Sequence, residues 1–251
     1  MKFLRIFFLL AIAATISCTG SKNESSESST STVSVKTDKT NNKAVIDAAK
    51  CFIAMDYDYE KLLTKEDVAK HTSIDEASFK KDVSPTHGEY GSCTYTWDSD
   101  RPDISMTTSG MTFNLPDQNL ATVKSLKIHN EDDLKLYNQS DVISLFETAY
   151  KKMSRQEYDE MIARLESEYA NDPDRLNQAK GFADARMNLD YGPVDNLGER
   201  AYWKWSDKFG IELVVLQGAV QFIIAAKTSS SAETSLPVAI NLAKEVLSKC
   251  N

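Results

Sequence analysis

The stretch that most constrains the fold runs from Arg200 to Lys227 and reads as three strands joined by two tight turns. Ile211 to Leu216 and Val220 to Ala226 are nearly continuous runs of β-branched and apolar residues, as in strands covered on both faces. Asp207 to Gly210 and the pair Gln217-Gly218 separate the strands, because glycine adopts the positive φ that tight hairpin turns require. The segment therefore predicts an antiparallel meander at the core of a domain.

Part of this pattern occurs earlier in the chain. Thirteen positions separate Trp97 from Gly110, and thirteen separate Trp205 from Gly218, with an apolar-rich strand after each glycine. The match predicts an antiparallel sheet built from two meander halves, related by an old duplication or only by the turn and aromatic preferences that meanders share. If the halves are equivalent, the two tryptophans occupy matching sites and both glycines lie in hairpin turns.

A helical insertion is predicted between the halves, from Ser140 to about Asn188. Apolar residues recur at helical spacing in three pieces of this tract. Ser154 with Glu157 matches a capping box, and Asp172-Pro173 is typical of a helix start. Apolar side chains at such spacing more often form core than a recognition groove.

Further helices are expected to flank the sheet. Val45 to Met55 and the segment from Tyr59 have helix-forming composition, and Thr64 to Asp67 resembles a capping box. Near the C-terminus, Thr228 to Ser235 reads as a polar loop, and Pro237 is expected to begin a final helix. The predicted fold class is α+β: an antiparallel sheet of two meander halves, with flanking helices and a helical insertion between the halves.

The first eighteen residues have the pattern of an export signal. Lys2 and Arg5 give a positive start, and the apolar run Ile6 to Ile16 is about half of the roughly twenty residues that a membrane-spanning helix needs. With small residues before Cys18, the pattern resembles the lipobox of bacterial lipoproteins, whose cysteine is acylated. The resemblance implies that Cys18 anchors the chain to a bilayer of the cell envelope, and Thr19 implies the outer membrane. The alternative is a plain signal peptide with an incidental cysteine.

This interpretation divides the chain into three parts. Residues 1–17 are the expected signal, residues 18–42 the acylated cysteine with a disordered tether, and residues 43–251 a single α+β domain. The tether is rich in Ser, Thr, Asn and Lys and has almost nothing apolar to bury. A flexible chain of this length has a typical reach on the order of 25 to 30 Å.

The net charge of the whole chain is −8, and removal of Lys2 and Arg5 with the signal leaves −10. A protein this acidic repels phosphate backbones and anionic head groups. Nucleic acid is therefore not an expected partner, and the expected contact with the bilayer is through Cys18. Solubility alone accounts for the acidic balance.

Three cysteines follow Cys18, namely Cys51, Cys93 and Cys250. In an oxidising compartment this number predicts one disulfide and one remaining thiol, and spacing alone allows three pairings. We expect Cys51 to pair with Cys93, because Cys250 lies one residue from a terminus that can fray. No C-x-x-C occurs and no histidine lies near these cysteines, so neither a metal nor a cofactor is predicted.

Catalytic motifs are not found in the sequence. It has no G-x-S-x-G, no H-E-x-x-H and no glycine-rich phosphate loop, and His71, His87 and His129 form no recognisable pair. No catalytic residue is therefore predicted. Asp98 to Asp103 holds three carboxylates that could bind a cation such as calcium, but a solvated turn is the favoured interpretation.

Five aromatic residues lie in the predicted strands. They could stack a ligand if one face of the sheet were open, but aromatic residues at this density more often form core. They are Tyr95, Trp97, Tyr202, Trp203 and Trp205.

The order of several segments in the mature chain resembles exported bacterial lipoproteins of unknown function with sensor-type α+β domains. The segments are LLTKEDV (Leu62 to Val68), CTYTW (Cys93 to Trp97), GERAYW (Gly198 to Trp203) and ELVVLQGAVQFII (Glu212 to Ile224), followed by a terminal helix. This resemblance implies a fold and no activity.

The favoured function is a lipid-anchored, non-enzymatic module that binds an unknown small ligand or envelope protein. A structural or assembly accessory is the alternative, and it predicts an exposed apolar patch on the helical insertion. An envelope hydrolase is less favoured, since it requires a cleft of convergent acidic residues.

Overall fold

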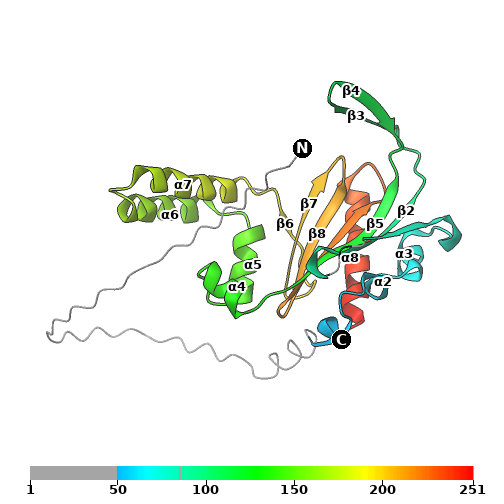
Figure 1. Cartoon of the computed structure of the whole chain (residues 1–251), viewed down its shortest axis with the longest axis horizontal. Coiled ribbons are helices and arrows are strands. Elements are labelled where there is room, and N and C mark those ends of the chain that lie inside the picture. Colours follow the sequence, from blue (N-terminus) through cyan, green and yellow to red (C-terminus); the bar gives the residue numbers. More distant parts are fainter. Residues whose placement is uncertain (1–49, 85, 87, 251) are drawn as a thin grey trace, which may run out of the picture. The chain divides into compact units, whose positions relative to one another are not determined.

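The computed structural model describes residues 50–84, 86 and 88–250. It confirms the α+β class, because this part of the chain contains a seven-stranded antiparallel sheet with helices around it (Figure 1). The predicted signal, Cys18, the tether and His87 lie outside the described residues. Of the helix predicted from Val45, residues 50–54 are described and are helical.

The sheet has the strand order β1-β2-β5-β9-β8-β7-β6, and every neighbouring pair is antiparallel. The sheet has two halves that meet where β5 pairs with β9, and the second half contains the predicted meander. The first half consists of β1 (Lys80–Val83), β2 (Ser92–Trp97) and β5 (Asn119–Ile128), and the second of β6 (Gly192–Pro193), β7 (Arg200–Ser206), β8 (Gly210–Gln217) and β9 (Val220–Lys227).

Two strands of the first half do not join this sheet. β3 (Ile104–Thr108) and β4 (Met111–Leu115) pair only with each other and run on beyond the ends of β2 and β5 (Figure 1). Trp97 therefore lies opposite a residue of β5, whereas Trp205 lies opposite Ile211 of β8. The two intervals therefore differ, because the strand that follows Trp97 leaves the sheet, whereas the strand that follows Trp205 pairs beside it.

The two glycines of the repeat do both lie in hairpin turns, as predicted. Ser109 and Gly110 join β3 to β4 with φ of 51° and 78°, the combination that a type I′ turn requires. Gly218 has φ of 62° and opens the turn between β8 and β9. The shared spacing thus reports a glycine with positive φ in each turn and not equivalent positions in the sheet.

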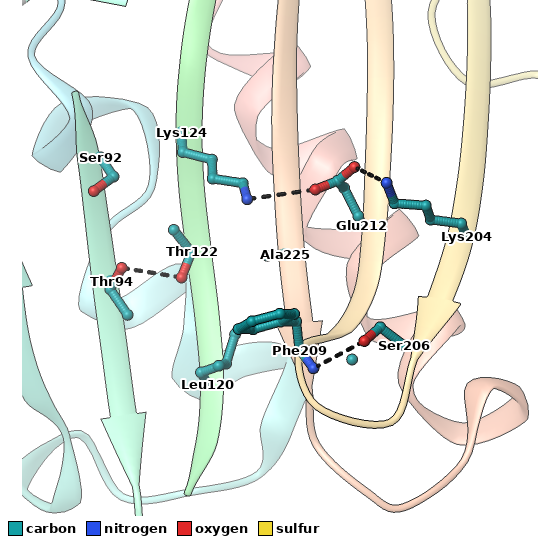
Figure 2. A pocket seen from close by; sticks show the side chains of 11 residues that line it. Ser92, Thr94, Leu120, Thr122, Lys124, Lys204, Ser206, Phe209, Glu212 and Ala225 are labelled. Carbon is teal, nitrogen blue, oxygen red and sulfur yellow. Dashed lines mark hydrogen bonds and ion pairs between the residues drawn. The ribbon is translucent and has the colours of Figure 1, made fainter. Parts of the chain in front are cut away.

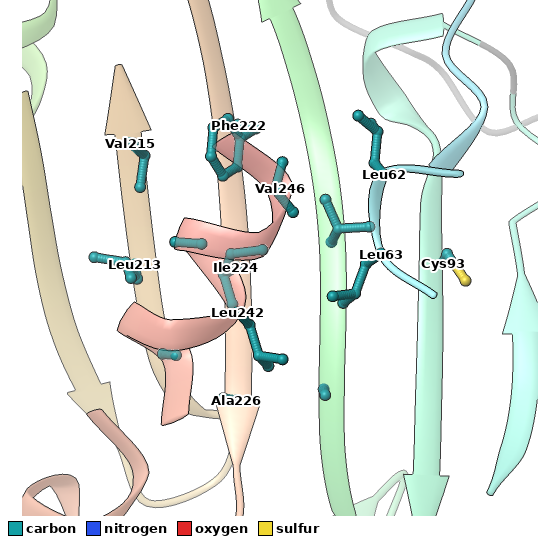
Figure 3. Close-up of a cluster of buried hydrophobic side chains, with 14 of the residues drawn as sticks. Leu62, Leu63, Cys93, Leu213, Val215, Phe222, Ile224, Ala226, Leu242 and Val246 are labelled. Atoms are coloured by element: carbon teal, nitrogen blue, oxygen red, sulfur yellow. The ribbon is translucent and has the colours of Figure 1, made fainter. Parts of the chain in front are cut away.

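The main core lies between one face of the sheet and three helices, α2 (Tyr59–Leu62), α3 (Lys65–Thr72) and α8 (Ala232–Ser248). Leu242 and Val246 of α8 pack over Leu213 and Ile224, as Figure 3 shows. The alternation of each strand sends one set of side chains into this core and the other set to the opposite face.

The segment between β5 and β6 contains four helices, of which the first precedes the predicted helical tract. They are α4 (Glu131–Leu136), α5 (Val142–Tyr150), α6 (Arg155–Glu168) and α7 (Pro173–Met187). Helix starts in the chain follow the predicted caps: capping boxes form at Thr64 and at Ser154, and Asp172 caps α7 with Pro173 in its first turn. These short-range hydrogen bonds are local, which explains why the sequence predicts them.

The start of the last helix differs from the prediction. α8 begins at Ala232, and Pro237 lies inside it. The polar run before Pro237 forms the first turn because its hydroxyls find partners: Ser235 is buried, and its Oγ accepts a hydrogen bond from the Thr228 amide at 3.2 Å. Proline removes one helical hydrogen bond near the start, which the helix tolerates.

The disulfide prediction is wrong. Cys51 pairs with Cys250, with the two Cα atoms 5.4 Å apart, and Cys93 is a free thiol. Cys93 is buried in β2, where strand alternation turns it into the core. The end of α8 does not fray, because Lys249 Nζ also pairs with Asp67 Oδ2 at 2.7 Å.

Candidate ligand site on the open face of the sheet

The sheet face opposite α8 is covered in one part and open in another. α5 covers part of it, where Phe146 packs with Tyr202, Val214 and Leu216. Beside this contact lies a cavity of about 680 Å³, lined by β2, β5, β9, β8, β7 and the β7–β8 turn. Figure 2 shows the lining side chains on the face of these strands.

Strand alternation determines which residues line the cavity. In β2, for example, Cys93 and Tyr95 point into the core, and Thr94 between them points into the cavity. Ala225 of β9 gives the floor a small side chain, which leaves room above the centre of the sheet. The lining consists of Ser92, Thr94, Leu120, Thr122, Lys124, Lys204, Ser206, Phe209, Gly210, Glu212 and Ala225.

A carboxylate flanked by two lysines forms the charged part of the lining. Glu212 lies 3.0 Å from Lys204 Nζ and 3.5 Å from Lys124 Nζ, and the two lysines approach it from opposite sides (Figure 2). Tyr191 donates its hydroxyl proton to Glu212 Oε1 at 2.7 Å. Burial opposes ionisation of Glu212, but the hydrogen bonds from Tyr191 and Lys204 outweigh it and lower the pKa of the carboxyl.

These charges leave the site with an excess of one positive charge, in a chain whose net charge is −8. Both lysine side chains are about one third exposed. Each ammonium group has three donors, so its contact with Glu212 leaves donors available. The Thr94 hydroxyl accepts from Thr122 at 3.0 Å and can donate its own proton. The polar part of the cavity therefore suits an anionic group.

The apolar part of the lining is centred on Phe209 in the β7–β8 turn. Its side chain is 63% exposed, and Figure 2 shows the ring extending toward Leu120. The turn is held in place: Lys227 Nζ donates to the Asp207 carbonyl at 2.6 Å, and Trp205 Nε1 donates to the Asp207 carboxylate at 2.7 Å. Phe209 is thus an exposed aromatic ring on a well-supported turn at the edge of the cavity.

A buried ion cluster supports this turn from below. Lys227 is only 2% exposed and lies 2.9 Å from Asp117 Oδ1, and Arg101 Nε lies 2.8 Å from Asp117 Oδ2. The hydrogen bond from Arg101, together with Lys227, lowers the pKa of Asp117 in spite of burial. The cluster joins the end of β9 to the base of the β3–β4 hairpin. Sequence reasoning did not identify Asp117 or Lys227, which lie 110 residues apart.

Asp98, Asp100 and Asp103 are exposed between β2 and β3, as the favoured solvated turn predicts. Arg101 of the same segment folds inward onto Asp117. No group of three or more potential metal ligands occurs in the part of the chain that the structure describes. The segment therefore forms the charged base of the hairpin.

The strand aromatics belong to the core and not to the cavity. Tyr95 and Trp97 are buried, and both pack edge-on against Phe79. Tyr202 is buried under α5, and the tryptophans of β7 pack against the main core. The core interpretation is thus confirmed for Tyr95, Trp97 and Tyr202, and the two β7 tryptophans are partly buried against the core. The open face carries threonines, lysines and one glutamate.

The two described histidines lie apart from the cavity. His71 Nε2 lies 2.8 Å from Glu245 Oε1 and ties α3 to α8. His129 is buried, which lowers its pKa, and its Nε2 faces Gln221 Oε1 at 3.2 Å. Neither is among the residues that line the cavity.

No protein-family model matches the chain, and searches of curated proteins and of solved structures found no significant similarity. Among the helices of the described residues, none combines the length and the apolar character of a membrane span.

Proposed function

We propose that this chain is a lipid-anchored, non-enzymatic binding module of the bacterial cell envelope, held on the outer membrane through Cys18. Its folded part binds a small amphipathic anion on the open face of the sheet. The observation that carries the ligand proposal is the arrangement of Lys124, Lys204 and Glu212 beside the apolar floor of the cavity.

The size and composition of the cavity support a small ligand. Its volume of about 680 Å³ lies within the range of about 300 to 1,000 Å³ typical of ligand pockets. Leu120, Ala225 and Phe209 offer apolar contact, and the two lysines offer charge-assisted hydrogen bonds next to it. A ligand with one anionic group and an apolar body matches both parts.

The same lining supports binding over hydrolysis. Acid hydrolysis mechanisms that use carboxyl groups need two of them in different protonation states. Glu212 is the one carboxylate among the residues that line this cavity, and its lowered pKa keeps it ionised. In our proposal it neutralises one of the two lysine charges and competes with an anionic ligand for their donors.

An assembly accessory is the second candidate. Leu136 and Tyr137, which precede the predicted helical tract, and Phe182 within it are exposed. Single exposed apolar side chains are normal on protein surfaces, however. The cavity therefore supports ligand binding more strongly than these residues support a docking function.

Ligand binding can be tested by calorimetry with decanoate as the probe and decanol as its uncharged partner. We expect decanoate to bind, and Lys204→Met and Lys124→Met each to weaken it about tenfold without affecting decanol. Glu212→Gln removes the competing carboxylate and should strengthen decanoate binding, whereas Ala225→Leu fills the floor and should weaken both ligands. Lys152→Met, at an exposed lysine after α5, is the matched control. Equal affinities in the wild type and in both lysine variants would disprove the ligand proposal.

The anchor is tested separately by feeding cells a clickable palmitate. The wild-type chain should incorporate the label and fractionate with the outer membrane, and Cys18→Ala should remain unlabelled. Label on the Cys18→Ala chain would contradict the assignment of that cysteine.

A further inference from the structure

The β3–β4 hairpin has no charged residue. From Ile104 to Leu115 the sequence is ISMTTSGMTFNL, in a chain of which 26% of the residues are charged. Serine, threonine, asparagine and apolar residues make up the rest of the hairpin, with Gly110 at its tip. A projecting element of this composition is suited to surroundings that disfavour charge.

The hairpin is amphipathic across its two faces. Met111, Phe113 and Leu115 alternate along β4 and therefore share one face, where they are 58%, 47% and 49% exposed. On the other face, Ser105 Oγ donates to Asn114 Oδ1 at 2.6 Å. The hydroxyls of Thr107 and Thr112 lie 3.0 Å apart on the same face. Its polar groups are thus paired with each other, and its apolar groups face outward.

Charge returns at the base of the hairpin. Asp98, Asp100 and Asp103 precede β3, and Asp117 follows β4. Asp117 is held there by Arg101 and by Lys227 of β9. The hairpin therefore has an uncharged outer part and a charged base that is held by ion pairs. The change from charged to uncharged residues occurs just before β3 and just after β4.

We propose that the β3–β4 hairpin rests on the lipid bilayer, with Met111, Phe113 and Leu115 directed toward the acyl chains. The location next to a bilayer rests on the proposed anchor at Cys18. The tether has a typical reach on the order of 25 to 30 Å. It leads to the end of the domain away from the hairpin, so the proposed contact requires the domain to lie along the surface (Figure 1). Acylated proteins commonly combine the anchor with a second, weaker membrane contact, because each increment of buried apolar surface adds to retention.

A second copy of the chain is a poorer occupant of this face. Three side chains of this size offer on the order of 300 to 400 Å² of apolar surface. A stable protein interface buries about 800 Å² on each partner. A bilayer needs no such minimum area.

The acidic base also selects among lipids: it repels anionic head groups, so we expect a preference for zwitterionic phosphatidylethanolamine and phosphatidylcholine.

The test places an environment-sensitive fluorophore at the tip through Ser109→Cys. Cys93 is buried and Cys51 is paired with Cys250, so among the described residues the new thiol is the accessible one. The full chain, processed by its host, is reconstituted into phosphatidylethanolamine–phosphatidylcholine vesicles. We expect blue-shifted emission at position 109 and quenching by lipids that carry a nitroxide on the acyl chain. The same label at Gln178→Cys, an exposed position of α7, should keep its emission in water.

A double variant, Met111→Ser with Phe113→Ser, removes two of the three apolar groups. It should abolish the blue shift and weaken vesicle binding of the unacylated protein about tenfold or more, while Thr112→Ser on the polar face should change neither. An unchanged melting temperature and unchanged decanoate binding show that the double variant is folded.

The outcome for the anchor is separate from the outcome for the hairpin. If mass spectrometry finds no acyl group on Cys18, the label is placed at position 109 of a Cys18→Ala chain that is titrated with vesicles from solution, and a blue shift there still supports the hairpin contact. Water-like emission at both label positions at high lipid concentration overturns the proposal. A shift that depends on protein concentration in the absence of lipid, together with a dimer in sedimentation, also overturns it in favour of a second copy.

Discussion

Two hairpins of this protein each turn at a glycine with positive φ but have opposite surroundings. β8 and β9 lie in the middle of the seven-stranded sheet, whereas β3 and β4 form a separate two-stranded ribbon. The strands of the first hairpin are apolar on both faces, because helices cover both sides of much of their length. Those of the second are apolar on one face and carry paired hydroxyls on the other. The difference teaches that strand composition, and not turn spacing, decides whether a hairpin is buried.

The largest expected effect comes from matched phenylalanines in the two hairpins. Phe222 of β9 is fully buried and packs against Phe52, with ring centroids 6.1 Å apart. Phe222→Ala should lower the free energy of unfolding by about 4 kcal/mol through the cavity that it leaves. Phe113→Ala in β4 should change it by less than about 0.5 kcal/mol. Urea denaturation of both variants measures the contrast, and similar losses would mean that the β3–β4 hairpin is part of the core.

Gly210 and Gly110 provide a second contrast. Both have positive φ, of 75° and 78°. A Cβ on Gly210 would lie 2.5 Å from the Ala226 carbonyl oxygen, whereas a Cβ on Gly110 would meet nothing within 4 Å. Gly210→Ala should therefore cost about 3 kcal/mol, because a backbone clash adds to the conformational strain. Thermal melting followed by circular dichroism checks this value, and a loss below about 1 kcal/mol would contradict the clash.

Asp117→Asn tests the ion cluster at the base of the β3–β4 hairpin, which connects that hairpin to β9 of the sheet. Loss of the charge leaves Lys227 buried with a weaker partner, and we expect a loss of about 2 kcal/mol near neutral pH. The pKa of Asp117 is lowered in the folded protein. Its contribution is therefore present above the unfolded-state value of about 3.9 and is lost as the pH falls through the folded-state pKa.

The pH profile provides the control for this prediction. Chemical denaturation between about pH 7 and pH 3 should show a steeper acid loss in the wild type than in Asp117→Asn. Parallel profiles of the two proteins would show that another carboxylate is responsible for the acid sensitivity.

The smallest expected effect belongs to Gly110→Ala. Strain at a positive φ should destabilise the hairpin turn by about 1 kcal/mol, without a clash to add to it. Because β3 and β4 pair only with each other, we expect faster amide hydrogen exchange in residues 104–115 and an unchanged global melting temperature. A global loss of stability would show that the ribbon and the sheet unfold together.

Local features of this fold could be predicted from the sequence, and long-range ones could not. The capping boxes at Thr64 and Ser154 and the strands β7 to β9 depend on residues within a few positions of each other, so their patterns are visible in the chain. The Cys51–Cys250 disulfide joins residues 199 positions apart, and no short pattern specifies it.

The candidate site was even less visible from the sequence. Its lining comes from five strands and one turn, and a lysine or threonine in a strand has no pattern that separates a cavity wall from an ordinary exposed face. Lys227 ends an apolar strand and resembles a surface residue, yet it is buried because Asp117 neutralises it. The aromatic residues were conspicuous in the sequence, and they proved to be core.

The bond between Cys51 and Cys250 has a mechanical consequence. A force that pulls on the chain from its N-terminal side reaches the described domain at the helical segment 50–54. There the Cys51–Cys250 disulfide transmits part of the force to the end of α8, and the backbone after Cys51 carries the rest. α8 packs along β8 and β9, so part of the force is transmitted to the centre of the sheet. The helical segment 50–54 is then less readily separated from the rest of the domain. Under reducing conditions the same pull would act on one short helix alone. The disulfide thus makes the N-terminal end of the described domain more resistant to a pulling force.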